Sequence, residues 1–105
     1  MKYRSYKPSD DSLSAGDVRR YTATGGGLAE SFYVVVMSAS SDAVRVRRLY
    51  KENLAGSRYL IGDVGPTGLE YAMFVDTKDA DLPRRGIGRR IGRLSKTDMR
   101  NVRSN

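Results

Sequence analysis

The sequence predicts a small, mainly β barrel that carries one short helix near its C-terminus. Short segments rich in β-branched and aromatic residues recur at roughly regular spacing, which favours a barrel over a sandwich of long strands. A single helix-start signal follows them, close to the end of the chain. The 105 residues suit one domain. We predict that this domain spans 16–105 and that a flexible, polar arm precedes it over 1–15.

The predicted strands alternate with segments rich in Gly, Pro, Ser and Asp. The strands cover 16–23, 32–39, 43–50, 58–64 and 69–76. The turns and loops cover 24–31, 40–42, 51–57, 65–68 and 77–83. The apolar run over 32–39 is typical of a strand buried on both faces. In 43–50, Val44 and Val46 alternate with arginines until the pattern slips at Arg48, which predicts a bulge or the end of that strand.

The helix signal lies within the stretch "RRGIGRRIGRLSKTDM". Ser95 is a good N-cap residue, and Asp98 stands three positions later, where its carboxylate can accept hydrogen bonds from free backbone N–H groups at the positive helix end. Leu94 and Met99 have the spacing of a hydrophobic staple, which fixes how the chain enters a helix. We therefore predict a helix over 95–102 and expect the staple pair to be buried together.

Charge is unevenly distributed along the chain, whose net charge is +7. Residues 1–42 hold five basic and five acidic residues, whereas 84–103 hold eight basic residues and Asp98 alone against them. We expect this basic stretch to be folded, as a strand that bends near Gly92 before the helix begins. A surface of one charge sign attracts polyanions and makes their binding dependent on salt. The alternative is a solvated surface that keeps a small protein soluble.

Composition excludes several classes of site. The chain has no cysteine and no histidine, so disulfides, Cys/His zinc sites, thiol nucleophiles and Ser-His-Asp triads are excluded. The glycines of 24–31 are not followed by the Lys-Ser/Thr pair of a P-loop. We expect no metal and no cofactor. No apolar run approaches the ~18 residues of a membrane span, and the N-terminus lacks the apolar segment of a signal peptide, so we expect a cytoplasmic protein.

The segment "RRIGRLSKTDM" (89–99) resembles the C-terminal signature of the MazF/PemK-like toxin family, in which a basic strand ends in a Gly-Arg-Leu-Ser element and a helix follows. "GDV" (16–18) and "VVVMS" (34–38) are similar to the first and second strands of the family. "LEYAMFVD" (69–76) falls where the family has an apolar strand. In outline the resemblance covers 16–102. It implies an SH3-like barrel of the MazF/PemK/CcdB type, a homodimer, metal-free cleavage of single-stranded RNA, and inhibition by an antitoxin.

The sequence departs from this family at its catalytic positions. The family has an arginine, followed by proline, directly before its second strand, and Phe32 and Tyr33 stand there in this chain. A catalytic Thr or Ser ends the third strand of the family, whereas 48–51 offer no hydroxyl except that of Tyr50. The Gln-Ile-Arg-Thr segment of the family is replaced by "TKDADLP" (77–83). The resemblance therefore implies the toxin scaffold without a matched active site, and no catalytic residue is assigned.

The residues expected to bind nucleic acid are arginines of the third predicted strand and of the basic C-terminal stretch: Arg45, Arg47, Arg48, Arg84, Arg85, Arg89, Arg90 and Arg93. Metal-free cleavage of RNA needs a base and a cation. The arginines of 43–50 are candidates for the cation, and the candidate bases are Asp76, Asp79 and Asp81. The alternative for this acidic loop is that it pairs with neighbouring arginines. Several tyrosines have the chemistry to stack on unpaired bases, although packing within or on the barrel is the default for each: Tyr33, Tyr50, Tyr59 and Tyr71.

The sequence thus predicts a toxin-like, growth-inhibitory protein that binds nucleic acid, RNA in preference to DNA, through a basic surface. One alternative is an interaction module of phage or plasmid type that binds and disables a host protein. Another is an active, metal-free endoribonuclease with a relocated active site. The expected partners are a single-stranded nucleic acid, an antitoxin or host protein, and a second copy of the chain.

Overall fold

The computed structural model describes residues 12–23, 30–53, 56 and 58–105. Within this part, the chain forms seven strands, two short 3-10 turns and one α-helix. The strands are β1 (Asp17–Ala23), β2 (Glu30–Ala39), β3 (Ala43–Tyr50), β4 (Tyr59–Leu60), β5 (Phe74–Val75), β6 (Ala80–Pro83) and β7 (Ile87–Arg93). The 3-10 turns are η2 (Gly65–Thr67) and η3 (Arg84–Gly86), and the helix is α1 (Lys96–Ser104). The predicted mainly β class with a short C-terminal helix is therefore confirmed.

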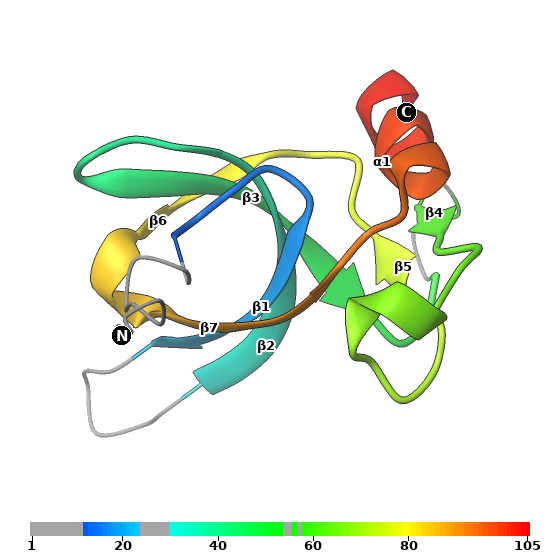
Figure 1. The fold of residues 1–105 in the computed structure, drawn as a ribbon, viewed down its shortest axis with the longest axis horizontal. Helices are drawn as coiled ribbons and strands as arrows, with labels where there is room; N and C mark the ends of the chain where they lie inside the picture. Colours follow the sequence, from blue (N-terminus) through cyan, green and yellow to red (C-terminus); the bar gives the residue numbers. More distant parts are fainter. Residues whose placement is uncertain (1–11, 24–29, 54–55, 57) are drawn as a thin grey trace, which may run out of the picture.

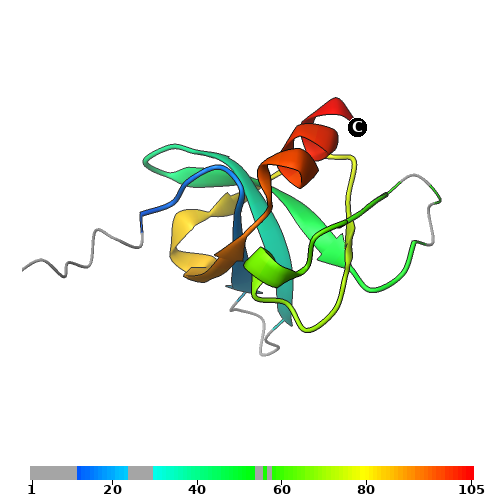
Figure 2. The same ribbon diagram turned by 45° about the vertical axis from the view of Figure 1, so that its right-hand side comes forward.

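The strands form one antiparallel sheet. Hydrogen bonds connect them in the order β4-β5-β3-β2-β1-β7, so the sheet is open between β4 and β7. β6 pairs with the first half of β3, whereas β5 pairs with its end. In Figure 1, β1 to β3 curve through the centre, β6 lies at one end, and β4, β5 and α1 lie at the other. Figure 2 shows α1 leaving the end of β7 at the side of the molecule that carries η2.

The long strands bury side chains on both faces, and this produces two cores. The helix-side core consists of Val18, Val35, Leu49, Ile61, Met73, Val75, Leu94 and Val102. The β6-side core consists of Tyr21, Val34, Val36, Val44 and Val46. Neighbours in β2 therefore belong to different cores, because successive side chains of a strand point to opposite faces. This arrangement confirms that the apolar run of the second predicted strand is buried on both faces.

The alternation of apolar residues in 43–50 changes at Arg48, but no bulge or strand end causes this change. β3 continues past Arg48 in regular register. Val44 and Val46 face the β6-side core, and Leu49 faces the helix-side core on the opposite face. The apolar pattern therefore changes phase without any break in the strand. The bulge of this hairpin lies in β2, at Met37, where the register with β3 shifts.

Three predicted segments differ from the observed elements. The range 58–64 contributes only the two residues of β4, and 69–76 only the two of β5. The range 77–83, expected to be an acidic loop, contains the strand β6. In β6, Asp81 lies directly opposite Arg45 of β3, with their side chains 3.1 Å apart. This pair of opposite charges adds to the packing of Leu82 against the β6-side core, and together they favour a strand beside β3.

The basic C-terminal stretch is folded, as predicted. β7 pairs with β1, and Ile91 is the extra residue of a bulge next to Gly92, where the sequence predicted a bend. A Cβ atom at Gly92 would lie 2.3 Å from the carbonyl oxygen of Pro66 and equally close to Thr67. Only glycine allows η2 to approach β7 this closely.

The start of α1 agrees with its predicted signals. The Ser95 hydroxyl accepts a hydrogen bond from the Asp98 N–H at 3.1 Å, which confirms the N-cap. Leu94 is buried in the helix-side core, and Met99 packs against the same core but is only partly buried, so the predicted burial of the staple pair is confirmed in part. The helix is amphipathic, and Val102 is its fully buried residue in that core.

Some predictions fall on residues outside the described part of the chain. Residues 1–11 of the predicted arm and 24–29 of the glycine-rich loop lie outside it. Residues 12–15 contact the domain, where Leu13 packs against the β6-side core and the Ser14 N–H donates to Asp17. No helix in the described part is long and apolar enough to cross a membrane.

Candidate functional site

A hollow of about 320 Å³ lies at the end of the sheet where β2 begins and β3 ends. Its walls are Arg20, Ser31, Phe32, Tyr33, Arg48, Leu49, Tyr50, Lys51, Tyr71 and Met73. Four of these side chains are aromatic and three are basic, and no carboxylate is among the described residues that line it. We call this site the aromatic–basic hollow.

The residues of the hollow come from both faces of the sheet, since Phe32 packs against the β6-side core and Tyr33 against the helix-side core. Arg20 of β1 lies directly opposite Tyr33 of β2, and Arg48 of β3 lies opposite the next residue of β2. Lys51 follows the last residue of β3, and Tyr71 belongs to the segment between η2 and β5. The site therefore depends on four separate parts of the chain.

Arg48 is held in place by aromatic rings. Its guanidinium carbon lies 4.0 Å from the ring centre of Phe32 and 5.1 Å from that of Tyr50. Arg58 lies over the same Tyr50 ring at 3.5 Å. Such cation–π contacts are favourable and become stronger as water is excluded. Arg48 also has a weaker contact with a carboxylate, because its Nη1 lies 4.0 Å from the Glu30 Oε2. The Arg48 side chain remains 38% exposed.

The other two cations of the hollow have no carboxylate partner among the described residues. The Arg20 Nε donates to the Ser31 hydroxyl at 2.6 Å, and both Arg20 and Lys51 are exposed. The register between β1 and β7 shifts at Arg20, so that two residues of β7, Gly88 and Arg89, lie across from it. Arg89 is exposed. The basic surface of the hollow therefore continues towards β7.

The eight arginines expected to bind nucleic acid do not form one surface. Arg48 lines the hollow, and Arg89 adjoins it in the register of the sheet. Arg84 donates to the Ser40 carbonyl oxygen at 2.7 Å, and Arg85 lines a separate depression beside η3. Arg90 lies opposite Arg19 of β1 in the sheet.

Arg45 and Arg47 are paired with the acidic strand β6 and the turn before it. The Arg47 Nε lies 2.8 Å from the Asp79 carboxylate, and its Nη1 donates to the Val102 carbonyl oxygen at 2.7 Å. The hydrogen bond and charge of Asp81 raise the pKa of Arg45. Asp79 and Asp81 therefore pair with neighbouring arginines, which was the alternative to a catalytic role.

The remaining candidate base, Asp76, organises a turn. Its carboxylate accepts hydrogen bonds from the Thr77 N–H at 2.7 Å and the Lys78 N–H at 3.3 Å, and from the Tyr50 hydroxyl at 3.4 Å. In the part of the chain that the structure describes, no group of three carboxylates is placed to hold a metal ion.

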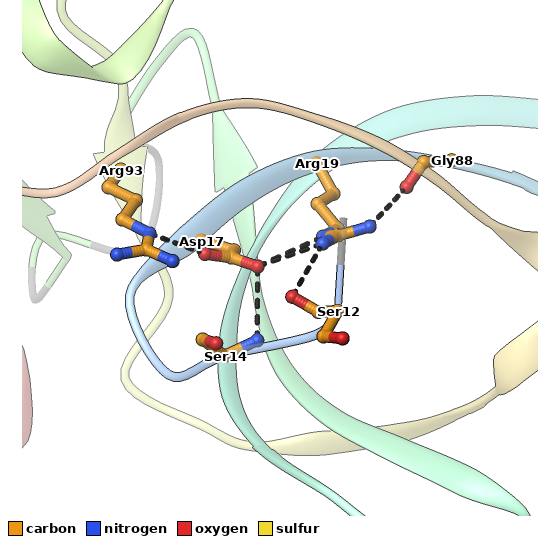
Figure 3. A network of polar contacts seen from close by, with 6 residues as sticks. All are labelled: Ser12, Ser14, Asp17, Arg19, Gly88 and Arg93. Carbon is orange, nitrogen blue, oxygen red and sulfur yellow. Dashed lines mark hydrogen bonds and ion pairs between the residues drawn. The ribbon is translucent and has the colours of Figure 1, made fainter. Parts of the chain in front are cut away.

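Arg93, the last of the predicted set, belongs to a structural network at the start of β1 (Figure 3). Its Nε lies 2.9 Å from one oxygen of Asp17, whose side chain is fully buried. The other oxygen accepts hydrogen bonds from Arg19 and from the Ser14 N–H. Arg19 is itself buried and donates to the Gly88 carbonyl oxygen at 2.9 Å. These contacts fasten β1 to β7 and to the segment that precedes β1.

Asp98 forms a second structural network, which fastens α1 to the segment after β4. Its buried carboxylate accepts hydrogen bonds from the Tyr59 hydroxyl at 2.5 Å, the Gly62 N–H at 2.9 Å and the Asp63 N–H at 2.9 Å. Burial of the carboxyl opposes its ionisation, but these hydrogen bonds together outweigh burial and lower the pKa of Asp98. The hydrogen bond to this carboxylate, and then burial, raise the pKa of Tyr59. The sequence predicted that this carboxylate accepts hydrogen bonds from backbone N–H groups at the start of its own helix. In the structure, the backbone N–H groups that donate to it are those of Gly62 and Asp63, in the segment after β4.

Sequence reasoning missed Arg20, Phe32 and Lys51 as members of a site. One signal could have found Phe32 and Lys51: Phe32–Tyr33 and 48–51 are the two segments that the resemblance aligns with catalytic positions, and both line the same hollow. That signal does not include Arg20, which belongs to β1. No protein-family model and no curated protein matches this chain.

Proposed function

We propose that this protein is a toxin-like inhibitor of growth that binds single-stranded RNA in the aromatic–basic hollow. The observation that carries the proposal is that four aromatic and three basic residues line one cavity. Single-stranded nucleic acid offers unstacked bases beside phosphates, and proteins bind it with aromatic platforms in positively charged grooves. A base inside a duplex cannot reach such rings, so the hollow favours single strands.

Each part of the hollow has a chemical role in this proposal. Tyr71 is 47% exposed and offers its ring to a base. Stacking of one base on an aromatic side chain contributes about 1–3 kcal/mol. Arg20 and Lys51 bind the phosphates on either side, and the stacked Arg48 guanidinium binds an oxygen of the phosphate or the base.

The scaffold that we propose is an SH3-like barrel of the MazF/PemK type, assembled as a homodimer. Two segments of the resemblance, at 16–18 and 89–99, lie in contact. The Leu94 N–H donates to the Gly16 carbonyl oxygen at 2.9 Å, and Arg93 lies 2.9 Å from Asp17. The preference for RNA over DNA and the homodimer rest on the resemblance alone.

We expect binding to dominate over cleavage, because the hollow supplies cations but no carboxylate base. Arg48 and Arg20 have the charge to stabilise a phosphorane, whereas the described residues that line the hollow offer only tyrosine and lysine to accept the 2′-hydroxyl proton. The carboxylates of Glu30 and Glu70 lie outside this lining. General base catalysis contributes about 10²–10⁴-fold to such reactions. Inhibition of growth would then come from occupation of an RNA and not from its hydrolysis.

Binding is tested by fluorescence anisotropy with a labelled single-stranded RNA of mixed sequence, over a series of salt concentrations. We expect the logarithm of the affinity to fall with the logarithm of salt concentration. Lys51→Ala should flatten this slope by about 0.7. Arg103→Ala removes one charge from α1, outside the hollow, and serves as the matched control. Affinity that does not respond to salt, or an equal loss in both variants, would contradict the proposal and favour a protein partner.

Cleavage and toxicity are tested separately. Purified protein should leave the RNA intact on a gel with and without EDTA, while its expression slows growth. Tyr71→Ala should relieve the inhibition and Arg103→Ala should not. Rapid, EDTA-resistant cleavage would place the endoribonuclease alternative first.

A further inference from the structure

A second hollow of about 370 Å³ adjoins the first. It is lined by Tyr33, Lys51, Gly68, Leu69, Glu70, Tyr71 and Met73, and four of these residues also line the aromatic–basic hollow. The two hollows therefore share a wall, which consists of Tyr33, Lys51, Tyr71 and Met73. Two adjoining sites with a common aromatic and basic wall suit two consecutive nucleotides of one strand.

The two hollows differ in charge. The first contains Arg20 and Arg48 besides the shared lysine, and it suits a phosphate with its attached base. The second contains the exposed Glu70, together with Leu69 and Met73. A carboxylate repels phosphate and can only accept hydrogen bonds. The second hollow is therefore suited to a base that presents hydrogen-bond donors.

We infer that the second hollow selects guanine, with Glu70 as the residue that determines this specificity; the inference rests on the proposed function. Guanine is the base whose Watson–Crick edge carries two adjacent donors, N1–H and the N2 amino group, and these match the two oxygens of a carboxylate. Cytosine and adenine offer an amino group beside an acceptor, and uracil offers N3–H between two acceptors. Bases of single strands are recognised on this edge while they stack on aromatic side chains.

The shared wall explains how guanine is held in place. Tyr33 is partly buried and packs against the helix-side core, so it forms a fixed floor. Tyr71 is exposed and lines both hollows, so its ring is available to stack on a base in either one. Lys51 lines both hollows and is placed to bind the phosphate that joins the two nucleotides.

The test uses labelled RNA hexamers that consist of uridine with one central guanosine, inosine, adenosine or cytidine, and an all-uridine control. We expect the guanosine hexamer to bind about tenfold more tightly than the all-uridine control, which corresponds to the discrimination given by one bidentate contact with a base. Inosine lacks the N2 amino group and should bind with intermediate affinity. Glu70→Gln should abolish the preference for guanosine and leave the affinity for the uridine hexamer equal or higher, since a negative charge is lost. Asp42→Asn, in an exposed turn outside both hollows, is the matched control.

The outcomes separate this inference from the proposed function. Equal binding of all five hexamers, or a guanosine preference that survives Glu70→Gln, would overturn the inference and leave the binding of single strands intact. Failure of every hexamer and of longer RNA to bind would overturn both. Loss of folding in Glu70→Gln is detected by circular dichroism, and Glu70→Ala then provides a second variant with the same expectation.

Discussion

Replacement of Asp98 by asparagine should release α1 from the segment after β4. The carboxylate is 2% exposed and accepts hydrogen bonds from Tyr59, Gly62 and Asp63. The asparagine side chain has almost the same shape, but it retains one acceptor oxygen and places an NH₂ group against donors. A hydrogen bond to a charged group contributes about 1.5–3 kcal/mol. Because the two backbone N–H groups lie on exposed residues and water can solvate them, we expect a total loss of about 2–4 kcal/mol in the free energy of unfolding.

The assay is urea and thermal denaturation monitored by circular dichroism. For a domain of this size, the loss corresponds to a decrease in Tm of about 10–20 °C. Asp42→Asn, which removes a carboxylate from an exposed turn, is the control and should change stability by less than about 0.5 kcal/mol. An Asp98→Asn protein as stable as its control would refute the reasoning.

The pH dependence of the same variant gives an independent check. Because the pKa of Asp98 is lowered in the folded protein, its ionisation stabilises the fold above the ordinary pKa of 3.8. This stabilisation is lost as the pH falls through the lowered pKa. The difference in unfolding free energy between the wild type and Asp98→Asn should therefore be constant from pH 5 to 7 and decrease below about pH 4. A difference that stays constant down to pH 2.5 would show that the charge of Asp98 has no part in the stabilisation.

Three further predictions follow from the packing and the resemblance. Gly92→Ala should destabilise the fold severely, because the new Cβ atom would lie 2.3 Å from the Pro66 carbonyl oxygen. Gly65→Ala is the control and should be tolerated, because its Cβ atom would lie at an ordinary 3.5 Å from the Asp63 Oδ1. Comparable yield and Tm for the two variants would contradict this prediction. Asp17→Asn should lower the free energy of unfolding by about 3–5 kcal/mol in urea denaturation, since it breaks the buried ion pair between Asp17 and Arg19, and a loss below about 1 kcal/mol would refute that role. Sedimentation at micromolar concentration should show a homodimer, and a monomer would remove the oligomer implied by the resemblance.

Local signals in the sequence were sufficient for several elements. The start of α1 was predicted correctly because its cap and staple involve neighbouring residues, Ser95 with Asp98 and Leu94 with Met99. The long strands were predicted correctly because their β-branched runs suit a buried sheet. The sequence also predicted correctly that 84–103 is folded, because an N-cap residue and a staple pair are signals of a helix and not of a disordered tail.

Non-local contacts decided the rest of the fold. The segment that contains β6 is acidic and was predicted to be a loop, yet it pairs with β3, where Leu82 packs against the β6-side core and Asp81 lies opposite Arg45. Its charges are unfavourable for a strand in isolation and become favourable only beside a basic partner. The phase change in β3 likewise has no local cause, because it reflects two cores on opposite faces of one strand.

The candidate site shows the same division. The sequence determined that this is a basic chain rich in tyrosine, without cysteine or histidine, and this excluded whole classes of catalytic chemistry. It could not show which arginines are available to a ligand. Arg45, Arg47 and Arg93 lie within 3.1 Å of aspartate oxygens in the folded protein, whereas Arg20 and Arg48 line a cavity, with Arg48 4.0 Å from Glu30. Charge is a property of each residue, but its availability depends on which side chains the antiparallel register brings within reach, and that is decided only when distant parts of the chain pack together.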